Sequence, residues 1–187
     1  MANLDLVFEP NLSRLKKLLL FPLVLFWAGL GQAQEAPILL VGPKLLPRLL
    51  QSIEGAKEKV VIQTYVFRLG KNSSSSTRQL LKALEQAAKR GVTVEIYLEQ
   101  ESGHKSDLNR ENRKIARRLE AAGGKVKFDR PERRSHAKTA VIDGRSCMVG
   151  SHNLTDSALR FNFEASLWLE SESVCQELET EIKKAFQ

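Results

Sequence analysis

The sequence predicts a single α/β domain in which a mixed β-sheet is flanked by helices. From Ala36 onward, segments with the period of a strand alternate with segments with the period of a helix. Residues 60–67 are apolar almost throughout, which is typical of a strand covered on both faces. The composition, 42% hydrophobic and 27% charged over 187 residues, excludes collagen-like, disulfide-scaffold and wholly disordered chains.

The first 33 residues are predicted to lie outside this domain, which then covers residues 37–187. Three basic residues precede an apolar run over 18–30, and small residues follow in the spacing that a signal peptidase reads. We therefore expect a signal peptide over 1–33 and export to the periplasm or secretion. The alternative is a membrane anchor over 18–34, although its 17 uncharged residues fall short of the span that crosses a bilayer comfortably.

The first half of the domain is predicted to alternate helix and strand. The apolar spacing gives a helix around 45–53, the buried strand over 60–67, a helix through Leu80, Leu84 and Ala87, and a half-buried strand over 92–98. A polar, Ser-rich loop over 70–76 precedes the second helix, and Gly91 ends it.

The second half begins with a polar loop over 99–106 and a very basic helix that Gly123 and Gly124 end. Its exposed basic side chains form either a solvated face or a surface that follows phosphates. The remaining elements are a strand over 126–128, two strands over 138–143 and 147–151 joined by an Asp143-Gly144 turn, a strand over 163–169, and a helix through Val174, Leu178 and Ile182.

Two cysteines, Cys147 and Cys175, lie in the predicted domain. They could pair in an exported protein. Nothing in the sequence fixes their proximity, so we expect two separate buried thiols. No CxxC motif and no His/Cys cluster suggests zinc, and we expect neither a metal nor a cofactor.

The chain is basic, with 29 Lys and Arg against 22 Asp and Glu and a net charge of +7. Removal of residues 1–33 takes away three basic and two acidic residues and leaves +6, so the charge belongs to the domain. A surplus of this size favours anionic partners, either nucleic acid or acidic lipid headgroups, without choosing between them.

The segment that begins at Ser135 contains the residues whose side chains are suited to catalysis. It reads His136-Ala-Lys138, four further residues and Asp143, and then Gly150-Ser151-His152-Asn153. Alternate residues of a strand face the same way, so His136 shares a face with Lys138. A turn at 144–145 would place His136 opposite Asn153, and a turn at 143–144 would place it opposite Ser151. In either register, an imidazole, an ammonium, a hydroxyl and an amide converge on one side of a hairpin.

This set of side chains suits phosphoryl chemistry. A neutral imidazole is a competent nucleophile, and Lys138 and Asn153 can hold phosphate oxygens. Glu164, eleven residues after Asn153, can hydrogen-bond the remote ring nitrogen of His136 and orient it. Asp143 has the opposite parity to His136, so we expect it to be a structural partner at the turn. His152 faces away from Ser151, and we expect a structural or surface role for it.

The pattern resembles the phospholipase D superfamily, with its His-x-Lys-x4-Asp motif followed by Gly-Ser-x-Asn. The resemblance extends to the 60–65 strand, the turn at 89–92 and Asn162-x-Glu164, and it covers about residues 37–187. It implies metal-independent phosphodiester cleavage through a phosphohistidine. The implied site consists of His136 as nucleophile, Lys138, Asn153 and Ser151 on the phosphate, and Glu164 orienting His136, with Asp143 and Gly150 as supporting members of the motif.

The superfamily uses two such motifs, one histidine as nucleophile and the other as acid for the leaving group. This chain has one, because His104 is followed directly by a lysine and lacks the spacing. It resembles the small single-motif members, bacterial endonucleases of the Nuc type that act as homodimers with the site across the two-fold axis. The resemblance therefore implies a homodimer with a composite active site.

We expect a nonspecific endonuclease on DNA or RNA, in which Arg130, Arg133 and Arg134 hold the phosphate backbone. The alternative within the same class is a phospholipase D that hydrolyses phosphatidylcholine-type lipids to phosphatidate. The sequence shows no obvious exposed apolar hairpin that would serve it at a bilayer. An alternative of another class is a nucleic-acid-binding module with a dispensable site, against which the intact His136 and Lys138 argue.

Overall fold

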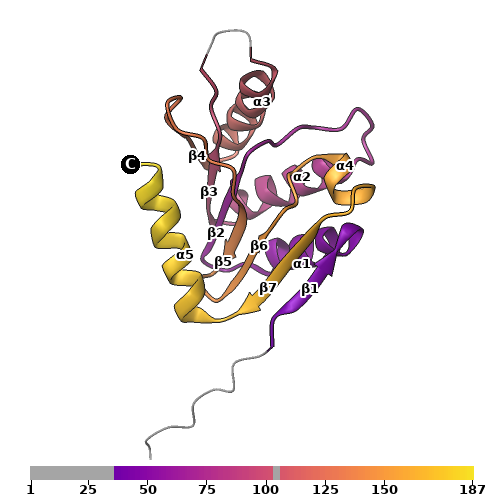
Figure 1. The fold of residues 1–187 in the computed structure, drawn as a ribbon, viewed down its shortest axis with the longest axis vertical. Helices are drawn as coiled ribbons and strands as arrows, with labels where there is room; N and C mark the ends of the chain where they lie inside the picture. Colours follow the sequence, from indigo (N-terminus) through magenta and orange to yellow (C-terminus); the bar gives the residue numbers. More distant parts are fainter. Residues whose placement is uncertain (1–35, 103–105) are drawn as a thin grey trace, which may run out of the picture. The chain divides into compact units, whose positions relative to one another are not determined.

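Seven strands form one mixed sheet in the order β1-β7-β6-β5-β2-β3-β4 (Figure 1). The structure is a computed structural model that describes residues 36–102 and 106–187. The strands are β1 (Ile38–Val41), β2 (Lys59–Thr64), β3 (Thr93–Leu98), β4 (Lys125–Phe128), β5 (Lys138–Ile142), β6 (Ser146–Gly150) and β7 (Ala165–Glu170). The predicted fold class is confirmed. The predicted signal or anchor segment and His104 lie outside the described residues.

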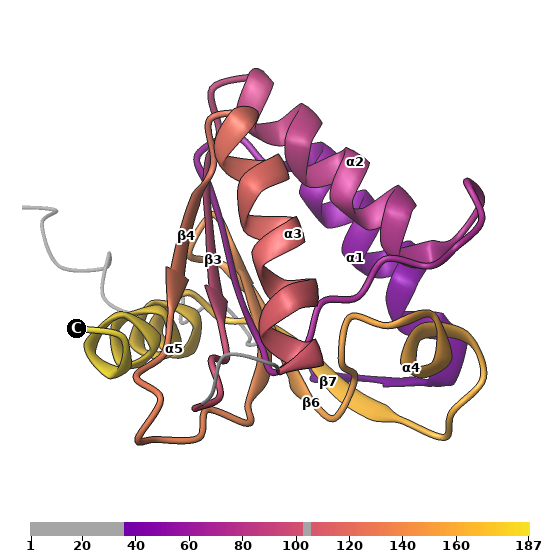
Figure 2. The same ribbon diagram turned by 90° about the horizontal axis from the view of Figure 1, so that it is seen from above.

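Helices cover both faces of the sheet. They are the 3-10 helix η2 (Gly42–Lys44), α1 (Leu45–Gly55), α2 (Ser76–Lys89), α3 (Asp107–Ala121), α4 (Asp156–Arg160) and α5 (Glu172–Ala185). In Figure 2, α1, α2 and α3 lie on one side of the sheet and α5 on the other. Strand β2 is central and alternates between the two cores. Val60 and Ile62 pack with α1, α2 and α3, whereas Val61 packs with α5. This double coverage explains why the segment is apolar throughout.

The helix boundaries follow from local capping. Ser75 and Ser106 precede α2 and α3, and each side chain accepts a hydrogen bond from a backbone N–H in the first turn. The predicted strand over 60–67 ends earlier, at Thr64, because the chain leaves the sheet after this residue. Phe67 forms only a single bridge to Leu154. Residues 65–67 therefore lie at the edge of the sheet where the site is found.

The β5–β6 hairpin has a register that differs from both predicted ones. Lys138 pairs with Gly150 and Ile142 with Ser146, so three residues, not two, form the turn. Two of them, Asp143 at φ 50° and Gly144 at φ 66°, adopt left-handed backbone, which the sequence did not reveal for the aspartate. Strand β6 ends at Gly150, so Ser151 and Asn153 lie beyond it and are not on the face of a paired strand.

The two cysteines form a disulfide, which corrects the expectation of separate thiols. Cys147 of β6 faces α5, and Cys175 lies near the start of that helix, with their Cα atoms 5.4 Å apart. Both residues are fully buried. The sequence could not show this proximity because it depends on how α5 packs back over the sheet.

Asp143 holds the turn to the α1–β2 connection, as its expected structural role requires. Its carboxylate accepts hydrogen bonds from the backbone N–H groups of Lys57, Glu58 and Lys59 at 2.9, 2.9 and 2.8 Å. Burial alone would raise the pKa of Asp143, but these three donors outweigh it, and the pKa lies below the ordinary 3.8.

Replacement of Asp143 by asparagine is expected to lower the free energy of unfolding by about 1–2 kcal/mol near neutral pH, because an amide cannot accept all three bonds. Because the pKa of Asp143 is lower in the folded protein, its ionised carboxylate stabilises the fold at pH values above the unfolded-state pKa. This contribution is lost as the pH falls through the folded-state pKa. Urea unfolding should therefore show a difference between the two proteins that shrinks below pH 3.8. Glu181→Gln, which changes an exposed carboxylate of α5, is the control. A difference that does not vary with pH would contradict this role.

Candidate functional site

The predicted site residues gather at one edge of the sheet. There β2, β3, β4 and β6 end, while β5 and β7 begin. His136 lies two residues before β5, and Lys138 is the first residue of that strand. Ser151 directly follows β6, and Glu164 directly precedes β7. Three separate segments thus contribute to one region through the topology of the sheet.

His136 and Lys138 are in direct contact. The Lys138 ammonium lies 3.0 Å from Nδ1 of His136 and also donates to the His136 carbonyl oxygen. An ammonium can only donate, so Nδ1 accepts and the ring proton lies on Nε2. Partial burial, Lys138 and Arg134 all lower the pKa of His136. The imidazole is therefore neutral near neutral pH, which is the form that a nucleophile needs.

Glu164 has partners other than the predicted one. Its carboxylate accepts hydrogen bonds from the Ser151 hydroxyl and, at 3.2 Å, from the Asn162 amide. Burial would raise the pKa of Glu164, but these two bonds lower it. The predicted hydrogen bond from Glu164 to His136 is not formed within the described chain. The carbonyl oxygen of Glu164 accepts from Gly42 N–H at 2.8 Å, which fixes its backbone beside the end of β1.

Two members of the Gly-Ser-x-Asn run are structural. His152 is fully buried, with Nδ1 2.8 Å from the Ser166 hydroxyl and Nε2 donating to the Gly42 carbonyl at 3.0 Å. Its expected structural role is confirmed. Gly150 packs against Ser166 so closely that a Cβ atom would lie 1.9 Å from the Ser166 hydroxyl oxygen. The motif therefore needs glycine at this position for packing.

Asn153 presents an unpaired amide oxygen. Its Oδ1 is buried and has no hydrogen-bond partner in the part of the chain that the structure describes. A buried polar atom without a partner costs free energy, so such atoms tend to occur where a ligand supplies the partner. An amide oxygen only accepts, whereas a phosphate oxygen needs a donor, so the predicted role of Asn153 on phosphate oxygens would use its amide N–H and stays a prediction.

The three predicted arginines differ in the contacts that they make. Arg133 forms an ion pair with Asp129, donates to the Ala185 carbonyl and lies over the Phe186 ring, so it stabilises the C-terminus of α5. These contacts engage its guanidinium within the protein, and its predicted role on the substrate backbone stays a prediction. Arg134 is exposed and its charge lowers the pKa of His136, which places it beside the site. Arg130 is exposed as well.

Sequence analysis missed two kinds of residue at this edge. Tyr65 packs its ring against the His136 imidazole, with centroids 4.8 Å apart. The signal in the sequence that could have placed Tyr65 at the site is its position directly after the buried strand β2. Phe161 and Phe163 are 75% and 88% exposed on either side of Asn162, an exposed apolar pair that the sequence did not make obvious. Loop exposure of this kind has no periodic signature.

Two further observations concern metals and membranes. Residues 36–102 and 106–187 contain no group of three or more His, Cys, Asp or Glu side chains placed to hold a metal ion. Within the same ranges, no helix has the length and apolar character needed to cross a bilayer.

Known proteins similar to this chain fall into two groups. A family model described as "Cardiolipin synthase, PLD-like domain" matches residues 49–186. The major cardiolipin synthase ClsA of Bacillus subtilis is 30% identical over 131 residues, which is 65% of this chain and 25% of that protein. A cardiolipin synthase of Listeria innocua is 25% identical over 170 residues, 86% of this chain and 33% of that protein. The chain thus spans a quarter to a third of the length of these relatives.

The second group consists of solved structures with a similar fold. Nuc from Salmonella typhimurium, a phospholipase D family member, aligns with a TM-score of 0.65 and 22% identity, over 80% of this chain and 94% of its own. NucT from Helicobacter pylori aligns with a TM-score of 0.63, also with 22% identity and the same coverage. At this level of identity, the likeness concerns the fold.

Proposed function

Because the chain belongs to the phospholipase D superfamily, we propose that it is a metal-independent, nonspecific endonuclease that cleaves DNA or RNA through a phosphohistidine on His136. The observation that carries the chemistry is the neutral His136 imidazole in contact with the Lys138 ammonium. The basic domain, the exposed Arg134 beside this pair and the exposed Arg130 favour a polyanionic strand as substrate. Nuc and NucT, which match this fold almost over their whole length, support the same proposal.

The proposed reaction has two half-reactions. A phosphodiester recruits the Lys138 ammonium to its non-bridging oxygens, which leaves a ring nitrogen of His136 with a free lone pair. That nitrogen bonds to phosphorus, the bond to the leaving oxygen breaks, and this oxygen takes a proton from a second acid. Water then attacks the phosphorus of the phosphohistidine and gives a proton to the second acid, which lost its own in the first half-reaction. The N–P bond breaks, and a phosphomonoester leaves. The amide N–H of Asn153 and the hydroxyl of Ser151, which in this structure donates to Glu164, are the groups proposed to bind the phosphate oxygens.

The need for a second acid supports the proposed homodimer. Of the two histidines in the described residues, His152 is buried and fully bonded, so among these residues only His136 is left for the site. A second copy would supply the acid, and the Glu164 carboxylate, which does not contact His136 of its own chain, would be available to the imidazole of that copy. Leu39, Leu167 and Val149 lie side by side across β1, β7 and β6 and are exposed, which gives an apolar surface suited to association.

Phospholipid cleavage or transfer is the second candidate, and one observation favours it. The exposed Phe161 and Phe163 flank the site and could enter the headgroup region of a bilayer. The named relatives of Bacillus and Listeria are cardiolipin synthases, so a lipid phosphodiester is the natural competing substrate.

A substrate panel tests the proposal. The full chain is incubated with plasmid, single-stranded DNA, RNA, and vesicles of phosphatidylcholine or phosphatidylglycerol, each with EDTA and with Mg²⁺. We expect nicked plasmid and shortened strands in EDTA as in Mg²⁺, because Lys138 supplies the cation that a metal would otherwise provide. Loss of cleavage in EDTA with recovery in Mg²⁺ would contradict the mechanism. Choline release or cardiolipin formation with intact DNA and RNA would replace the nuclease with the lipid enzyme.

A further inference from the structure

Tyr65 contacts both reactive residues of the site with one ring. It is the first residue after β2, at the edge where β5 begins. Its ring centroid lies 4.8 Å from that of His136, with the planes inclined at 58°, and 5.6 Å from the Lys138 ammonium. An aromatic face attracts a cation at this distance and restricts the rotation of a neighbouring ring. The imidazole is therefore bounded by Lys138 and by Tyr65.

The hydroxyl of Tyr65 is fixed in turn by a carboxylate. It donates to Oε1 of Glu101 at 2.7 Å, and the Ser106 hydroxyl donates to the other oxygen at 2.7 Å. Asn109 of α3 accepts from the backbone N–H of Glu101 at 2.9 Å and donates to its carbonyl at 2.8 Å. The Ser106 and Tyr65 hydrogen bonds lower the pKa of Glu101, so it remains an ionised acceptor. The bond to Glu101 and burial raise the pKa of Tyr65, so it remains a donor.

We propose that Tyr65, anchored by Glu101, is a positioning residue that holds the His136 imidazole against the Lys138 ammonium. This inference rests on the proposed role of His136 as nucleophile. Tyr65 keeps the ring in one orientation before substrate arrives, and it keeps the ammonium beside the ring through its aromatic face. Its hydroxyl does not take part in bond making. The ring carries the effect, and the hydroxyl only secures the ring.

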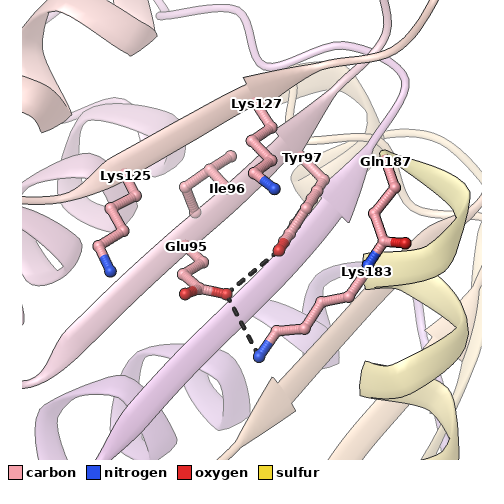
Figure 3. Close-up of a pocket in the computed structure, with 7 residues that line it drawn as sticks. All are labelled: Glu95, Ile96, Tyr97, Lys125, Lys127, Lys183 and Gln187. Carbon is pink, nitrogen blue, oxygen red and sulfur yellow. Dashed lines mark hydrogen bonds and ion pairs between the residues drawn. The ribbon is translucent and has the colours of Figure 1, made fainter.

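The other tyrosine of the chain provides a matched control. Tyr97, on the neighbouring strand β3, donates to Oε2 of Glu95 at 3.2 Å, and Lys183 pairs with the same carboxylate (Figure 3). Its ring packs edge-on against Phe186, with centroids 5.0 Å apart. The two tyrosines thus share a hydroxyl–glutamate bond and an aromatic-type contact. They differ in that only Tyr65 touches His136.

The test compares Tyr65→Leu, Tyr65→Phe and Tyr97→Leu with the parent protein on bis(p-nitrophenyl) phosphate, a phosphodiester that carries neither a nucleobase nor a lipid chain. We expect Tyr65→Leu to lower kcat about 10- to 100-fold with KM changed about threefold at most, because misplacement of a reacting group acts on the chemical step. Tyr65→Phe should recover most of kcat. Tyr97→Leu should lower thermal stability while leaving kcat near the parent value.

Imidazole ¹⁵N resonances of His136 provide a second readout that needs no turnover. The parent should show one Nδ1 signal of an unprotonated acceptor, and Tyr65→Leu should shift it toward the average of two tautomers. An unchanged spectrum together with an unchanged kcat in Tyr65→Leu would overturn the proposal, as would an equal loss of kcat in Tyr97→Leu. If the parent hydrolyses no phosphodiester at all, the proposed function fails, and the resonances of His136 still decide whether Tyr65 fixes the ring.

Discussion

The His136→Asn protein is expected to lose at least about 10⁴-fold in turnover while its affinity for nucleic acid changes little, since loss of a nucleophile removes the covalent route. The groups proposed to hold the phosphate, Lys138, Ser151 and Asn153, all remain. Single-turnover cleavage and fluorescence anisotropy measure the two quantities on the same DNA. With the parent protein quenched at low pH, a base-stable, acid-labile label on His136 would identify the intermediate.

His152→Asn is the matched control for this variant. It makes the same substitution at the buried histidine and removes the bonds to Ser166 and Gly42, so it should lower stability and retain turnover. Light scattering should give a dimer for the parent and for His136→Asn. Retained cleavage by His136→Asn would show that another group is the nucleophile, and a fully active monomer would refute the composite site.

Reduction of the disulfide between Cys147 and Cys175 is expected to lower the free energy of unfolding by about 3–4 kcal/mol, because the bond closes a loop of moderate length in the unfolded chain. For a domain of this size, that change corresponds to a fall in Tm of about 10 °C. Urea unfolding with and without dithiothreitol measures it. Activity under native conditions should persist, since Cys147 is three residues from the site end of β6 and its side chain packs against α5.

The Cys147→Ala, Cys175→Ala double variant is the control for this measurement. It should unfold at the lower urea concentration of the reduced protein and show no response to dithiothreitol. Equal stability of the oxidised and reduced parent would mean that the bond contributes nothing and that the two residues behave as the separate thiols expected from the sequence.

The elements that could be predicted are those with a periodic apolar pattern. Leu45, Leu49 and Ile53 lie on one face of α1 and are completely buried, and β2 is covered on both faces as its composition indicates. The gathering of the motif at one edge could also be predicted, because its two halves lie at the open end of one hairpin in any register.

What could not be predicted depends on contacts between distant segments. The register of the β5–β6 hairpin differs from the predicted ones because a non-glycine residue, Asp143, adopts left-handed backbone. Three hydrogen bonds from the backbone of residues 57–59 stabilise this conformation. The contacts of Arg133 depend on where the end of α5 lies. The partner of Glu164 depends on its backbone bond to Gly42, more than a hundred positions away in the chain.

The position of Asp143 has a consequence for how such sequences can diverge. Strand β5 carries Lys138 at the site and ends directly before Asp143, which is tied to the α1–β2 connection at the opposite edge of the sheet. An insertion or deletion of one residue between them would turn Lys138 to the other face or pull Asp143 from its three donors. The four residues between them are all buried, so related sequences can exchange one compact side chain for another there. Their number, however, must stay constant, and the spacing of the motif records the length of a strand as well as the needs of the chemistry.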